Sequence, residues 1–160
     1  MEAKPQKEHE WLQQLVGEWT CESECRMGPD KLPESFTGSE VVRSIGGLWI
    51  VCEGQGEMPD GGHATTIMTL GFDPAKQRYL GTFIGSMMAN LWLYEGALDA
   101  NGTTLPLNSE GPSFTDPTKT AKYRDVIEIK SANHRVMTSH VLGGDGKWTS
   151  FMTANYRRKT

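Results

Sequence analysis

Two cysteines four residues apart are the first candidates for chemistry in this chain, Cys21 and Cys25 in "LVGEWTCESEC". On a β-strand they share one face but stand about 13 Å apart, at about 3.3 Å per residue. A disulfide needs Cα atoms within about 7 Å, so these two cannot pair within one strand. Cys52 could approach one of them across neighbouring strands, but cysteine often behaves as a small buried hydrophobe. We therefore predict free thiols, and the spacing does not favour zinc.

The other side chains that could do chemistry lack the spacing that a reaction would need. None of the histidines has the spacing of a metal motif; they are His9, His63, His134 and His140. His140 lies within an alternating stretch and could point into a barrel, although a structural role is favoured. Ser86 is not in a Gly-x-Ser-x-Gly elbow, and Asp125 and Glu128, three apart, face opposite sides of a strand. We predict no catalytic residue, no metal site and no cofactor.

Bulk properties narrow the class of protein. The chain has 160 residues, a formal net charge of -4 and a pI near 5.6, so a nucleic-acid partner is not expected. No apolar run reaches the roughly 20 residues of a membrane span, which predicts no membrane partner. The N-terminus "MEAKPQKEHEW" lacks the apolar core of a secretory signal, and the cysteine count is odd. Both features favour a cytoplasmic location.

The elements that must position these residues are mostly strands. A helix is predicted at about 5–16, with Trp11, Leu12, Leu15 and Val16 on one face. After Gly17, alternating stretches rich in β-branched and aromatic residues are separated by turn signals. The expected strands are 19–25, 35–45, 48–57, 63–72, 78–85, 91–99, 103–109, 121–130, 135–142 and 148–157. No segment suits a βαβ crossover, so we predict one all-β domain over residues 1–160, an antiparallel up-and-down barrel of about ten strands.

Several stretches carry a family resemblance. A short helix followed by Gly17-Glu18-Trp19 resembles the Gly-x-Trp signature of lipocalins and the wider calycin group. In that group the Trp packs at the closed barrel end against an Arg of the last strand, which implies Trp19 with Arg157 or Arg158. "LGFDPAKQRYLGTFIGSMM", "LWLYEGALD" and "FMTANYRR" resemble the bacterial family named domain of unknown function 1579, which implies a lipocalin-like barrel and no particular reaction. The missing secretory signal and unpaired cysteines argue against extracellular transport.

The function predicted from these features is the binding of a small, largely apolar ligand inside the barrel, since barrel mouths often hold apolar pockets. Aromatic residues and methionines spread over many strands are the expected wall, together with two polar candidates. The predicted ligand-binding residues are Trp49, Met68, Phe83, Met87, Met88, Trp92, Tyr94, Tyr123, Arg124 and His140. Two alternatives stay open: an enzyme using His140 or Arg124 with a carboxylate, and a filled barrel acting as a homodimer through "LWIV" and "NLWLY".

Overall fold

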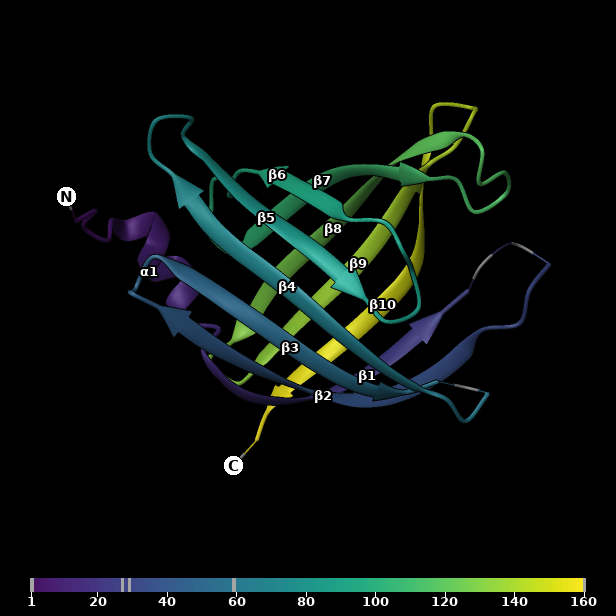
Figure 1. Ribbon diagram of the computed structural model, residues 1–160, viewed down its shortest axis with the longest axis horizontal. Coiled ribbons are helices and arrows are strands. Elements are labelled where there is room, and N and C mark those ends of the chain that lie inside the picture. The colour runs from purple at the N-terminus through teal and green to yellow at the C-terminus, as the bar shows by residue number, and fades with distance from the viewer. Residues whose placement is uncertain (1, 27, 29, 59, 160) are drawn as a thin grey trace.

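The computed structural model describes residues 2–26, 28, 30–58 and 60–159. It shows a closed antiparallel barrel of ten strands, joined in chain order and preceded by one short helix (Figure 1). The elements are α1 (Lys7–Gln13), β1 (Gly17–Cys25), β2 (Glu34–Ile45), β3 (Trp49–Glu57), β4 (His63–Asp73), β5 (Arg78–Gly85), β6 (Trp92–Gly96), β7 (Thr104–Pro112), β8 (Thr120–Ser131), β9 (His134–Leu142) and β10 (Trp148–Arg158). The predicted fold class and all ten predicted strands are confirmed.

The ring is closed by β1, which pairs with β2 on one side and with β10 on the other. Cys21, for example, lies opposite Gly38 of β2 and opposite Tyr156 of β10. Because successive side chains of a strand alternate between its faces, every second residue points into the barrel. In β1 the inward set begins at Trp19 and continues with Cys21, Ser23 and Cys25.

The helix is shorter than predicted, because its last turn is tightened. The backbone N–H groups of Leu15 and Val16 donate to the carbonyls of Leu12 and Gln13, which are three residues back rather than four. This turn leads the chain directly into β1. Among the described residues, no helix is long and apolar enough to cross a membrane.

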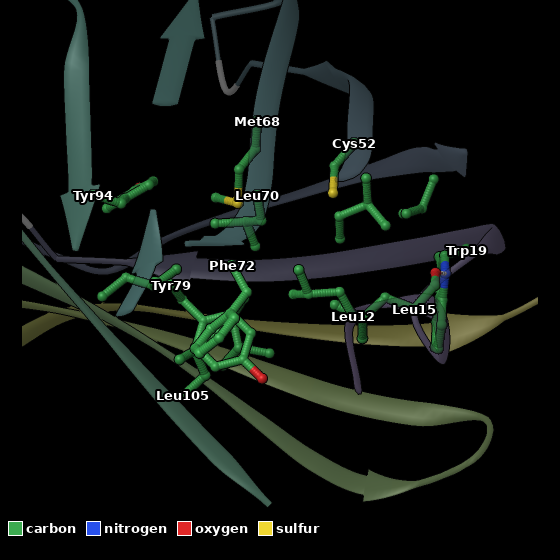
Figure 2. Close-up of a cluster of buried hydrophobic side chains, with 14 residues drawn as sticks. Leu12, Leu15, Trp19, Cys52, Met68, Leu70, Phe72, Tyr79, Tyr94 and Leu105 are labelled. Atoms are coloured by element: carbon green, nitrogen blue, oxygen red, sulfur yellow. Dashed lines mark hydrogen bonds between the residues drawn. The ribbon is translucent and has the colours of Figure 1, made fainter. Parts of the chain in front are cut away.

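One end of the barrel is closed by α1, which lies across it at the left of Figure 1 and packs against β3 and β4. Leu12 and Leu15 of this N-terminal segment are fully buried, as predicted. Figure 2 shows them in the same cluster as Trp19, Phe72 and Tyr79. The rings of Phe72 and Tyr79 make an edge-on contact, with centroids 5.0 Å apart. This end of the barrel is therefore a filled hydrophobic core.

The Gly-x-Trp segment ties the helix, the first strand and the last strand together. The Trp19 indole N–H donates to the carbonyl of Leu15 at 2.9 Å, and the Arg158 guanidinium lies 4.2 Å from the Trp19 ring centroid. Arg158 also donates to the carbonyls of Gln14 and Val16. Gly17 has a φ of +139°, and a Cβ at this position would clash with the Arg158 guanidinium. Of the two candidate arginines, Arg158 fills the predicted role.

The pairing between β6 and β7 is the shortest between neighbouring strands of the barrel. These strands pair only at Glu95 with Asn108 and at Gly96 with Leu107, whereas β7 pairs with β8 over nine residues. Pro106, which lacks an N–H to donate, lies in β7 next to this short ladder. Pro106 therefore does not mark an edge strand, because β7 has neighbours on both sides in the closed barrel, but its pairing with β6 is short.

Candidate ligand-binding cavity

A cavity of about 490 Å³ occupies the half of the barrel away from α1. Leu15 lies at its inner end, and its rim is formed by loop residues such as Met87, Met88 and Phe114. A broader hollow of about 780 Å³ lies by the ends of β1, β2 and β10, where Glu22, Glu24 and other exposed polar residues line it. We take the deeper, mostly apolar cavity inside the barrel as the candidate site, because small-molecule pockets are concave and apolar.

The cavity exists because one side of the wall carries very small side chains. Gly38, Gly56 and Ala64 lie next to one another in register across β2, β3 and β4, and all three line the cavity. Gly54 of β3 lies opposite Thr66 of β4, two residues closer to the α1 end of the barrel, and both also line the cavity. With hydrogen atoms or single methyl groups pointing inward, this side, the small-residue wall, leaves the lumen unfilled.

The facing side is built from large side chains. In the strand order of the ring, β8 lies half a turn from β3. It contributes Tyr123, whose ring makes an edge contact with Trp92 of β6 at 5.0 Å. Phe114 and Phe151 extend this cluster toward the rim, with ring centroids 5.1 Å apart. We call this side, from β6 through β10, the aromatic wall.

A buried ion pair lies at the inner part of the cavity. Arg135 of β9 donates to the carboxylate of Glu40 of β2, and their side chains are only 6% and 11% exposed. The same guanidinium lies 4.1 Å from the Tyr156 ring centroid and 4.4 Å from that of Trp19. Burial raises the pKa of Glu40, and the nearby Arg135 opposes that shift. The two charges cancel locally.

A second carboxylate faces the cavity from β8. Asp125 is half-buried and accepts a hydrogen bond from the Tyr94 hydroxyl of β6. Burial raises the pKa of Asp125, while the hydroxyls of Tyr94 and Ser139 lower it by favouring the charged form. In the described part of the chain, no ion pair joins Asp125 to a cationic side chain.

All three cysteines line the cavity as free thiols. Cys52 is buried, Cys21 approaches the Ser23 hydroxyl at 3.3 Å, and Cys25 lies near the rim. Burial is the main reason that the pKa of each thiol is raised, so all three favour the neutral form. Among the described residues, no three His, Cys, Asp or Glu side chains come together as a metal site.

Seven of the ten predicted ligand-binding residues line this cavity: Met68, Phe83, Met87, Met88, Trp92, Tyr94 and Tyr123. The other three lie outside it. Trp49 is 44% exposed and covers Gly71 on the outer surface. Arg124 donates to the Asn108 side chain and lies over the Trp148 ring, while His140 contacts the Arg124 carbonyl. Arg124 and His140 face each other in register on the outside of the barrel.

Sequence reasoning did not select the charged residues that face the lumen: Glu40, Asp125 and Arg135. For Asp125 a signal was present. In "AKYRDVIEIK", Tyr123, Ile127 and Ile129 share one face with Asp125, while the other face carries Arg124, Glu128 and Lys130. The apolar face of such a strand points inward. Adjacent residues cannot both face the lumen, so Tyr123 and Arg124 could not both belong to the site.

Comparison with solved structures gives the same fold at low sequence identity. Rv2717c from M. tuberculosis has a TM-score of 0.67 and 12% identity, covering 98% of this chain and 100% of that one. The S-type phycobiliprotein lyase CPES from Guillardia theta has a TM-score of 0.63 and 13% identity, covering 98% and 99%. EF1p2_mFAP2b bound to DFHBI has a TM-score of 0.52 and 15% identity, covering 95% and 99%.

The sequence comparisons place the chain in a family without assigning an activity. Comparison with curated proteins gives no match. The family model described as "Protein of unknown function (DUF1579)" matches residues 4–158, nearly the whole chain. The chain therefore belongs to the DUF1579 family.

Proposed function

We propose that this protein binds a small, largely apolar molecule inside its barrel. The observation that carries the proposal is the mostly apolar cavity of about 490 Å³, with a filled core at one end and an open rim at the other. Pockets for small molecules span about 300–1,000 Å³ and combine an apolar lining with a few placed polar groups. Arg135, Glu40, Asp125 and Tyr94 are such groups here.

Two further observations support this proposal. EF1p2_mFAP2b, which shares the fold, is bound to DFHBI, so a barrel of this type can accommodate a small molecule. The three free thiols that line the cavity suit a reducing compartment, and we include a cytoplasmic location in the proposal.

The two alternatives fare less well against the geometry. An enzyme built on His140 or Arg124 would need these side chains at the cavity, and both lie on the outer surface. A filled barrel is at odds with the open lumen. The homodimer stays a prediction; of the segments named for it, Trp49, Leu91 and Leu93 are exposed, whereas Ile50 and Tyr94 are buried.

The test is to fill the cavity without disturbing the fold. The neutral dye N-phenyl-1-naphthylamine, which fluoresces in apolar surroundings, serves as the probe. A Cβ on Gly56 points into the lumen with its nearest neighbour, the Thr37 carbonyl oxygen, at 3.5 Å. Gly56→Leu should therefore fold normally and weaken dye binding at least about tenfold, because the side chain takes the ligand's space.

Gly144→Leu is the matched control, since a Cβ there meets no atom within 4 Å and the residue lies in the loop between β9 and β10. It should bind the dye as the native chain does. Native mass spectrometry of the protein purified from its own cells gives the second readout. The proposal fails if the native chain carries no small molecule and does not bind the dye, or if both variants bind it unchanged.

A further inference from the structure

Every sulfur-bearing side chain that the structure describes lines the cavity. Each of the three cysteines lines it, and so does every methionine that the structure describes: Met58, Met68, Met87, Met88, Met137 and Met152. Met1 and Met27 lie outside the described residues. Sulfur is polarisable, makes favourable contacts with aromatic rings, and in methionine adapts to the shape of a partner. A lining of this kind favours an aromatic or conjugated ligand over a saturated chain.

The shape of the lumen points the same way. On the small-residue wall, Gly38, Gly56 and Ala64 present almost no side chain, so a ligand can lie directly against the sheet. The aromatic wall, half a turn around the ring, offers the rings of Tyr123, Tyr94 and Trp92. Aromatic rings prefer offset-stacked or edge-on contacts with other rings. The space between the small-residue wall and the aromatic wall therefore suits a flat molecule.

The charges inside the cavity select against an anion. Arg135 is the one cationic Lys or Arg side chain among the described lining residues; its Nη2 group pairs with Glu40, which balances its charge, while its Nη1 group has no hydrogen-bond partner. Asp125 remains as a further carboxylate in the interior, and Glu34 and Glu57 add two at the rim. A carboxylate ligand would meet one cation that already has a carboxylate partner, beside three further carboxylates, whereas a cationic nitrogen could pair with Asp125 and lie against the rings beside it.

We propose that the ligand is a planar aromatic or conjugated molecule carrying a cationic nitrogen, with Asp125 as the residue that recognises this charge. The inference rests on the proposed binding function and names the ligand class for the same cavity. Asp125 is placed for this role because Tyr94 donates to one of its oxygens, Oδ2, and holds the carboxylate in position while the residue stays half-buried at the cavity wall.

Three probes that share one ring system test the charge preference. They are 9-(aminomethyl)anthracene, 9-anthracenemethanol and anthracene-9-carboxylate, which are cationic, neutral and anionic at neutral pH. Binding is followed by anthracene fluorescence and by displacement of N-phenyl-1-naphthylamine. We expect the amine to bind most tightly and the carboxylate most weakly, at least about tenfold apart. Dodecylamine, a saturated amine, should bind at least about tenfold more weakly than the anthracene amine.

Asp125→Asn is the diagnostic variant, because asparagine keeps the shape and can still accept the Tyr94 hydrogen bond. It should weaken binding of the amine at least about tenfold, leave the alcohol unchanged and improve binding of the carboxylate. Glu110→Gln removes an exposed carboxylate on the outer face of β7, outside the cavity lining, and is the matched control. It should change the affinity for the amine by no more than about twofold.

The outcomes separate this inference from the function on which it rests. Equal affinity for the three anthracenes, or tightest binding of the carboxylate, overturns the charge preference while dye binding still supports a ligand cavity. An unchanged amine affinity in Asp125→Asn removes Asp125 from the role. Dodecylamine binding as tightly as the anthracene amine overturns the planar class. Loss of binding of every probe, including the dye, overturns the proposed function itself.

Discussion

The two ends of this barrel are built from different side chains, although the same ten strands run through both. At the end covered by α1, the inward residues are large and fit together with no more than 2% exposure: Leu12, Leu15, Trp19, Ile50, Leu70, Tyr79, Leu105 and Leu107. At the other end, the inward residues include Gly38, Gly56 and Ala64, and the rim exposes Met87, Met88 and Phe114. We call these the closed end and the open end.

This contrast separates stability from the proposed ligand binding along the barrel axis. Buried aliphatic and aromatic side chains provide most of the favourable free energy of folding, and they are concentrated at the closed end. The open end gives up part of this packing, and the space left is the cavity. Substitutions at the closed end should therefore act mainly on the free energy of unfolding, and those at the open end mainly on affinity.

The largest effect on stability is expected for a matched pair of tryptophans. Trp19 is 1% exposed and packs beneath two guanidinium groups, whereas Trp148 at the open end is 37% exposed. Trp19→Ala should lower the free energy of unfolding by about 3–5 kcal/mol, because it leaves a cavity and unpairs Arg135 and Arg158 from the ring. Trp148→Ala should lower it by less than about 1 kcal/mol. Urea unfolding followed by circular dichroism compares the two, and equal losses would contradict the division between the ends.

A smaller loss is expected when the last strand is released from the helix segment. Arg158 donates to the carbonyls of Gln14, Val16 and Ala132. Arg158→Lys keeps the charge but loses the planar fork that reaches several acceptors, and should cost about 1.5–3 kcal/mol in the same unfolding experiment. The exposed neighbour Arg157 is the control, since Arg157→Lys should change stability by less than about 0.5 kcal/mol. A similar loss in both variants would assign the effect to the strand end in general.

The closed end was predictable from the sequence, and particular residues show why. The helix with Leu12 and Leu15, the strands with their turns, and Trp19 beside a C-terminal arginine all follow from local pattern or family resemblance. Local pattern works here because each of these elements is specified by its own residues. Sequence alone left open whether Arg157 or Arg158 meets Trp19, and the register of β1 with β10 decides this.

The open end was harder to predict, because a cavity is defined by missing side chains and by pairings between distant strands. Gly38, Gly56 and Ala64 form a wall only in the register of β2, β3 and β4. In the sequence each glycine suggests a bend or a bulge. Two other predictions were wrong because the sequence did not show which face of the strand points inward. Arg124 and His140 were predicted to line the cavity, whereas Asp125 and Ser139, one residue away in each strand, face the lumen.

The cysteines offer a kinetic comparison along the same axis. Cys25 lies near the rim, whereas Cys52 is 4% exposed and burial raises its pKa strongly. With a disulfide reagent such as 5,5′-dithiobis(2-nitrobenzoate), Cys25 should react more than about tenfold faster than Cys52, because the thiolate attacks and needs access. Cys25→Ser should remove the fast phase, and saturating N-phenyl-1-naphthylamine should slow it in the native chain. Equal rates for both thiols would mean that the barrel opens globally before reaction.

The smallest effect concerns pH, and it separates the cost of Asp125 to folding from its proposed role in binding. Burial raises its pKa above the usual value near 3.9, against the opposing influence of Tyr94, Ser139 and His140. An acid with a raised pKa in the folded state favours folding when protonated, and that contribution is lost as pH rises through the folded pKa.

Asp125→Asn should therefore be slightly more stable than the native chain at neutral pH, with a Tm higher by a few degrees. This advantage should shrink as pH falls through the raised pKa and vanish below about 3.9, where the carboxyl is protonated in both folded and unfolded chains. Scanning calorimetry from neutral to acidic pH measures the difference, with the exposed outer-face variant Glu24→Gln as the control. A native chain that is the more stable at neutral pH would instead mean that the charged carboxylate holds Tyr94 and Ser139 in place. The open end would then contribute to folding as the closed end does.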